Sequence, residues 1–165
     1  MELAPTLLGL GVVVTGLVSG LLYGWAVSVI PGTRQIPDAA YVDTMQNVNR
    51  EIINPLFVLP FMGVPVLLGI AAWAQFRAGD SRRGWLLLSA AGTYAVGVLG
   101  VTIGGNIPLN DALDRFDLAG AGAAELDERR HSYETPWNRW HGLRTVASVG
   151  AFGLVAAAAL VAEDG

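Results

Sequence analysis

The sequence contains no cysteine and no lysine, and only 15% of its 165 residues are charged. The lack of cysteine excludes disulfide bonds, thiolate nucleophiles and cysteine-based metal sites. The charged fraction lies well below the quarter or so that is usual in soluble domains. All ten basic residues are arginine and the net charge is −4, so the chain lacks the basic stripe of a nucleic-acid-binding protein. We therefore expect no nucleic-acid partner.

The chain is instead rich in long apolar runs. Hydrophobic residues make up 53% of the chain, and they are gathered into four runs close to the 20 or so residues that a helix needs to cross a bilayer. We predict an all-α fold, a bundle of four transmembrane helices that forms one integral membrane domain. The domain covers residues 1–165, with spans at about 7–30, 55–76, 84–103 and 141–162.

Local signals predict how these spans begin, end and bend. The first run lacks a basic segment before it, so we expect a retained helix that ends at Pro31-Gly32. Pro60 and Pro65 fall inside the second span, where we expect neighbouring groups to satisfy the carbonyls that these prolines leave free. Thr135 is the expected cap of the last helix, with Pro136 in its first turn.

The connections between spans one and two and between spans three and four are expected to carry short helices. In residues 38–53 the apolar side chains recur every three or four residues, with polar ones between them, which predicts an amphipathic helix. A second short helix is expected over residues 110–118, with Asn110 as its N-cap, and a third, rich in charge, over residues 123–133.

Arginine placement predicts the orientation. The turn between spans two and three carries Arg77, Arg82 and Arg83, which the positive-inside rule assigns to the cytoplasm. Both termini would then be cytoplasmic as well, in what we expect to be a prokaryotic plasma membrane. The two longer connections must share the opposite side, which brings three polar clusters to one end of the bundle.

The first cluster is Trp137, Trp140, His141 and Arg144. On a helix, Trp137, His141 and Arg144 lie on one face. Ionisable side chains at membrane depth are costly and indicate a site. An aromatic belt with an interfacial arginine is the simpler alternative, about equally favoured.

The second and third clusters consist of Asn47, Arg50 and Asn54, and of Asn106 and Asn110 around Pro108. Asn47, Arg50 and Asn54 share a helix face, although a solvated polar face with Asn54 as a cap explains them somewhat better. Helix termination by Asn106 and capping by Asn110 is slightly favoured for the third cluster. We expect Trp25 to be an interface or core residue.

No cofactor or metal site is supported by the sequence. His131 and His141 lack the spacing of metal ligands, and most carboxylates lie in the connections. A phosphate-binding loop, a nucleophile elbow and a dinucleotide fingerprint are all absent. We therefore expect neither a cofactor nor a metal.

Three segments in this order resemble the anthrone oxygenase family of small four-helix membrane proteins. They are Met45 to Pro55, Val101 to Asn110 with its Asn-x-Pro-Leu-Asn element, and Trp137 to Thr145 with its Trp-x-x-x-His-x-x-Arg element. The resemblance covers most of the chain. It implies oxidation of an anthrone to an anthraquinone with O2, without a cofactor, because the deprotonated substrate can itself reduce O2.

The residue types suit that chemistry, and we assign roles to them on this hypothesis. His141 is the expected base. Arg50 and Arg144 would hold the anion, with Asn106 and Asn110 orienting it. Substrate contacts are expected from Asn47 and Asn54, and the rings of Trp137 and Trp140 would stack on the substrate.

Two other functions remain open on the sequence alone. Glycine-rich faces suit close helix packing or a homo-oligomer, so the chain could be a non-catalytic module that binds a lipid, a quinone or a partner helix. A small transporter accessory is the third hypothesis, and the lack of charge at mid-span counts against it.

Overall fold

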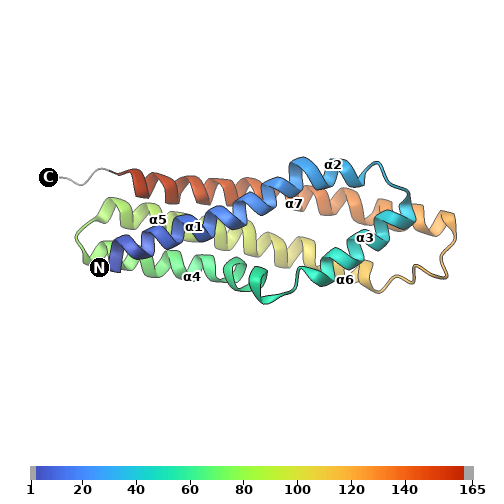
Figure 1. Cartoon of the computed structure of the whole chain (residues 1–165), viewed down its shortest axis with the longest axis horizontal. Coiled ribbons are helices and arrows are strands. Elements are labelled where there is room, and N and C mark those ends of the chain that lie inside the picture. Colours follow the sequence, from blue (N-terminus) through green and yellow to red (C-terminus); the bar gives the residue numbers. More distant parts are fainter. Residues whose placement is uncertain (1–2, 162–165) are drawn as a thin grey trace.

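The computed structural model describes residues 3–161, which fold as helices joined by short connections (Figure 1). The structure is 88% helical, and no strand occurs among these residues. Four helical rods are long and apolar enough to cross a membrane, and they confirm the predicted all-α bundle. They run over Leu3–Thr33, Pro55–Arg77, Ser81–Asp114 and Ala123–Leu160.

Two of the rods contain wider π-helical turns. The first rod consists of α1 (Leu3–Gly24), η1 (Trp25–Val29) and α2 (Ile30–Thr33). The third consists of α5 (Ser81–Tyr94), η2 (Ala95–Gly100), η3 (Thr102–Asn106) and α6 (Ile107–Asp114). Such turns are rare and often lie at functional sites. The remaining helices are α3 (Asp38–Glu51), α4 (Pro55–Arg77) and α7 (Ala123–Leu160).

Two predicted helix caps are wrong, and the first rod ends one residue later than expected. The first rod passes Pro31 and Gly32 and ends at Thr33. Asn110 is not an N-cap, because α6 continues directly from η3 and holds Asn110 inside it. Thr135 caps nothing, since α7 runs without a break from Ala123 to Leu160. The predicted amphipathic helix at 38–53 is confirmed as α3. Residue 162, the predicted end of the fourth span, lies outside the described residues.

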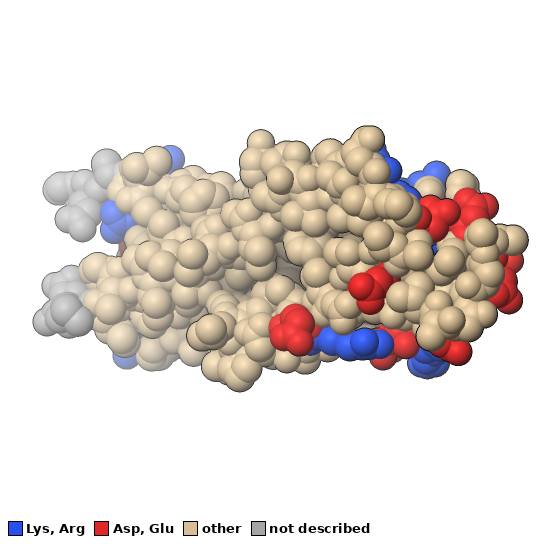
Figure 2. Space-filling view, turned by 45° about the vertical axis from the view of Figure 1, so that its right-hand side comes forward, with Lys and Arg blue, Asp and Glu red and all other residues tan. Residues whose placement is uncertain are grey.

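The four rods form a ring in which α1 contacts α4 and α7, and α5 contacts the same two helices. Their shared core is built from small and branched side chains such as Ala71, Ala90 and Val155. Large apolar side chains also cover the outside, including Leu59 and Val96, which are 72% and 76% exposed. Figure 2 shows a wide uncharged band between two charged ends. This surface suits lipid, and the protein is an integral membrane protein.

A second core joins the two connections at one end of the bundle. There, α3 and α6 pack on the first half of α7 through Tyr41, Met45, Leu113 and Tyr133. Arg130 of α7 ties the 34–37 connection to this end, because its guanidinium donates to the carbonyl of Ile36 and to the carboxylate of Asp38. The end that holds the predicted polar clusters is therefore folded and packed.

The third rod packs closely against α7 at two glycines. A Cβ atom added at Gly97 would lie 2.5 Å from the Cβ of Ala147, and one at Gly105 would lie 2.5 Å from the ring of Trp140. A larger residue at either position would therefore displace its neighbour on α7. The two glycines thus keep the segment between them, including Thr102, against α7.

Tyr94 satisfies the carbonyl that Pro65 leaves without a donor inside α4. Pro65 has no N–H to offer the carbonyl of Phe61, four residues earlier, and the hydroxyl of Tyr94 donates to that carbonyl at 2.9 Å. The expectation that neighbours satisfy such a carbonyl is confirmed here. The bond also ties α5 to the segment of α4 that lines the pocket described below.

We predict that Tyr94→Phe destabilises the protein by about 1–3 kcal/mol, because the buried Phe61 carbonyl loses its donor. Unfolding of purified protein in mixed micelles, followed by circular dichroism, measures this difference. Tyr23→Phe is the matched control, since Tyr23 is 56% exposed and makes no hydrogen bond in the described structure. Equal stability of the two variants would contradict a stabilising hydrogen bond from Tyr94 to the Phe61 carbonyl.

Candidate functional site

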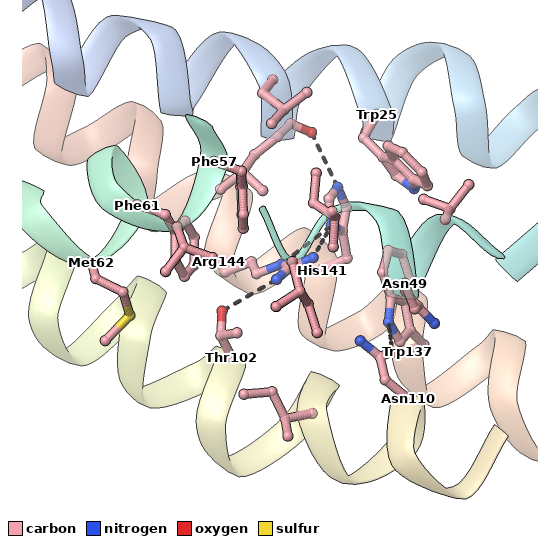
Figure 3. Close-up of a pocket in the computed structure, with 17 residues that line it drawn as sticks. Trp25, Asn49, Phe57, Phe61, Met62, Thr102, Asn110, Trp137, His141 and Arg144 are labelled. Carbon is pink, nitrogen blue, oxygen red and sulfur yellow. Dashed lines mark hydrogen bonds between the residues drawn. The ribbon is translucent and has the colours of Figure 1, made fainter. Parts of the chain in front are cut away.

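A pocket of about 290 Å³ lies between the four rods and α3, at the end where the two longer connections meet (Figure 3). Its volume is at the lower end of the range for small-molecule sites, about 300–1000 Å³. Twelve of its seventeen lining residues are apolar or tryptophan, with rings from Trp25, Phe57, Phe61 and Trp137. The pocket is therefore largely apolar and lined by aromatic rings, as is common in small-molecule sites.

Arg144 supplies the pocket's positive charge. Its guanidinium donates to Thr102 Oγ1 at 3.2 Å and to His141 Nδ1, and it lies 5.4 Å from the centre of the Trp137 ring. No carboxylate of residues 3–161 pairs with it, whereas Arg130, whose side chain is 14% exposed, pairs with Asp38 and Glu134. The pocket thus presents a cation without a counter-charge to whatever occupies it.

Hydrogen bonds fix the tautomer of His141. Its Nε2 lies 3.1 Å from the carbonyl oxygen of Leu22, which can only accept, so Nε2 carries the hydrogen. Nδ1 then carries the lone pair, and it accepts from Arg144. His141 is buried and neutral in this arrangement, with its one lone pair directed at the guanidinium. A proton could enter the ring only at Nδ1, beside Arg144.

The ring of Trp137 joins this group to a chain of amides. Trp137 stacks on His141, with ring centres 5.0 Å apart and planes 6° from parallel. Its indole N–H donates to Asn110 Oδ1 at 2.8 Å. The Tyr133 hydroxyl donates to the same oxygen and accepts from Asn49 Nδ2, both at 3.0 Å. One rigid face of α7 therefore sets the geometry of two asparagines that line the pocket.

An ion pair and two exposed apolar residues lie at the edges of the pocket. An ion pair of 2.6 Å between Arg50 and Asp114 joins the ends of α3 and α6 above it. Its lining includes Ile53 and Met62, whose side chains are 76% and 48% exposed on the apolar outer surface. The pocket therefore reaches the apolar outer surface of the bundle beside Ile53 and Met62.

Four of the nine predicted site residues line the pocket, namely His141, Arg144, Asn110 and Trp137. Asn106 lies just behind them. It is 1% exposed and donates to the Trp137 carbonyl at 3.3 Å, while its own Oδ1 is buried without a partner. Asn106 therefore supports the helix that carries the site and does not line the pocket.

The other four predicted residues are not brought into the pocket. Asn47 is exposed and donates to Asp43, and Arg50 makes the ion pair above the pocket. Asn54 is the N-cap of α4, as the simpler interpretation held. Trp140 packs on Gly105 and is 41% exposed on the outside of the bundle.

Sequence reasoning missed several lining residues. Asn49 lies on the opposite face of α3 from Asn47, because α3 packs on the bundle through Val42 and Met45. Helical spacing of three and four residues from Val42 and Met45 places Asn49 on the same face, and this spacing could have identified it. Trp25 lines the pocket, although it was expected to be an interface or core residue. Thr102 is a single polar residue in an apolar run, and no sequence pattern around it indicated a place in the pocket.

Comparison with known proteins agrees with this arrangement. The family model for anthrone oxygenase matches residues 56–154, which is 99 of the 165 residues. No curated protein and no solved structure gives a significant match. The matched range includes Thr102, Asn110, Trp137, His141 and Arg144 and so contains most of the polar pocket residues. The chain belongs to the anthrone oxygenase family.

Proposed function

We propose that this protein is a membrane-embedded oxygenase that oxidises a flat, apolar anthrone- or hydroquinone-like molecule with O2. The observation that carries the proposal is Arg144, a cation with no counter-charge among the described residues, facing an apolar pocket lined by aromatic rings. Such a site favours a molecule that is apolar in body and negatively charged at one oxygen. The family to which the chain belongs supports the same reaction class.

The reaction balances without any further reductant. An anthrone with O2 gives an anthraquinone and water: two hydrogens leave the ring carbon opposite the carbonyl, and that carbon gains one oxygen atom. Loss of a proton gives an electron-rich aryloxide, which transfers electrons to O2 and forms a carbon–oxygen bond. The resulting hydroperoxide loses water to form the second carbonyl. The protein must favour the aryloxide and keep it dry.

Arg144 and His141 have complementary roles in this proposal. The enol hydroxyl of the substrate lies beside both side chains, and its proton passes to His141 Nδ1. The Arg144 N–H group that donates to Nδ1 then turns to the substrate oxygen that becomes negative. Another N–H group of Arg144 keeps donating to the Thr102 hydroxyl, as it does in the structure. The aryloxide in turn offsets the charge of the imidazolium. Proton transfer and anion binding are thereby coupled.

The remaining predicted residues act around this pair. The ring of Trp137, held parallel to His141, stacks on the flat substrate. Asn110 orients the substrate, and Asn106 fixes the backbone of Trp137. Arg50 contributes by closing the pocket above, through Asp114, and not by touching the anion.

Arg144→Gln should lower kcat/KM for anthrone oxidation by about 10²–10³, the usual cost of removing one oxyanion donor. Oxygen uptake by proteoliposomes with anthrones and hydroquinones measures it. Arg139→Gln is the matched control, since Arg139 lies on the same helix, is exposed and has no ion pair among the described residues. Equal loss in both variants would contradict the role of Arg144.

Wild-type protein that binds these molecules without consuming oxygen would contradict the oxygenase proposal itself. It would favour the alternative of a non-catalytic module that binds a quinone or lipid in the same pocket.

His141→Ala should lower turnover by about 10²–10⁴, the usual contribution of a positioned base. His141→Gln tests the role further, because an amide can donate to Leu22 and accept from Arg144 but cannot take up the proton. We expect both variants to be equally slow in the oxygen-uptake assay. Recovery of activity in His141→Gln would show that the ring only positions Arg144.

We also propose that the α4–α5 turn faces the cytoplasm and that the pocket end faces the opposite side. The absence of cysteine makes this testable with single cysteines. In intact cells a membrane-impermeant maleimide should label Ala119→Cys, in the α6–α7 connection, and should label Ser81→Cys only after lysis. The reverse pattern would invert the orientation.

A further inference from the structure

The pocket lining contains a second polar group, formed by Asn110 and Asn49, each of which keeps one amide atom without a partner among the described residues. The indole N–H of Trp137 can only donate, so the Asn110 side-chain atom 2.8 Å from it must be the oxygen. That oxygen also accepts from the Tyr133 hydroxyl. The Asn110 amide NH2 therefore points the other way, and no described residue accepts from it. Figure 3 shows this nitrogen directed into the pocket.

The same chain of bonds orients Asn49. Because the Tyr133 hydroxyl gives its hydrogen to Asn110, it must accept from Asn49, and the atom of Asn49 that faces Tyr133 is the nitrogen. The Asn49 oxygen is then left as an acceptor without a donor among the described residues. Both asparagines line the pocket. One tyrosine hydroxyl thus leaves an amide donor on Asn110 and an amide acceptor on Asn49 available, on two residues that line one pocket.

These two atoms select a chemical group. A carbonyl or a carboxylate could use the Asn110 NH2 but would face the Asn49 oxygen as a second acceptor. A hydroxyl group can accept from the first and donate to the second at once. Phenolic hydroxyls are the form of that group carried by flat aromatic molecules.

This pair lies apart from Arg144. In Figure 3, Asn49 and Asn110 are on the side of α3 and α6, and Arg144 with Thr102 is on the other side of the cavity. Apolar side chains, among them Ile52 and Ile107, complete the lining. A ligand that satisfies both groups must carry an oxygen at each end of an apolar body.

We propose that Asn110 and Asn49 form a recognition site for a phenolic hydroxyl on the edge of the substrate away from Arg144. This inference rests on the proposed function for the identity of the aromatic ligand. It makes the substrate a hydroxylated aromatic and assigns to Asn49 a role in specificity that does not involve the reacting atoms.

Binding of non-reacting ligands tests the site separately from turnover. Tryptophan fluorescence of the purified protein, which has Trp25 and Trp137 in the pocket, is titrated with anthraquinone and with its monohydroxy isomers. In the wild type, the best isomer should bind about tenfold more tightly than anthraquinone, as expected for two modest hydrogen bonds. Asn49→Leu and Asn110→Asp should reduce this preference to about one. The aspartate keeps the acceptor for Trp137 and Tyr133 but removes the amide donor.

The two affinities, for the hydroxylated ligand and for anthraquinone, are compared within each variant. A substitution that weakens the binding of both ligands equally therefore leaves their affinity ratio unchanged. Asn138→Leu, the same substitution on α7 outside the pocket, should keep the wild-type preference. A wild-type ratio near one for every isomer, failure of the wild type to bind any of them, or an unchanged ratio in both pocket variants would overturn the proposal. If the preference holds but no anthrone or hydroquinone is oxidised, the recognition site stands and the oxygenase proposal fails.

Discussion

The site depends on one arginine that is kept inside an apolar bundle without a carboxylate partner. A charged side chain in the apolar part of a membrane protein is costly unless other groups stabilise it. Arg144 is held there by neutral groups only, the Thr102 hydroxyl, His141 Nδ1 and the face of Trp137. Each of these satisfies an N–H or shields the charge, and none cancels it. The electrostatic gain on binding an anion is therefore left for the ligand.

Several features of the fold serve to keep these neutral groups in place. Gly97 and Gly105 let the third rod approach α7 closely enough for Thr102 to meet Arg144. The π-helical turn at Thr102–Asn106 widens the helix just before Pro108, which lacks the N–H of a regular turn. Helix α1 passes close enough for the Leu22 carbonyl to fix the tautomer of His141. The site thus draws on three of the four rods for its first polar contacts.

Sequence reasoning found the part of the site that lies on one helix. Trp137, His141 and Arg144 follow helical spacing, and the structure brings their side chains together. It failed where the outcome depended on how helices pack. On α3 the polar residues at helical spacing marked the exposed face, while Asn49, on the packed face, lines the pocket. The ends at Asn106 and Thr135 were expected from local signals, but both rods continue, because packing in the second core supports the extra turns.

We propose that the pocket stabilises the anionic form of a flat phenol or enol beside Arg144. The visible absorption spectrum of a bound dihydroxyanthraquinone, with one hydroxyl for the Asn49 and Asn110 pair and a second beside Arg144, reports this directly, because the neutral and deprotonated forms absorb at different wavelengths. Wild-type protein should give the spectrum of the deprotonated form at a pH where the free ligand is neutral, and Arg144→Gln should give the neutral spectrum. A neutral spectrum on saturated wild-type protein would contradict the stabilisation of the anion by Arg144.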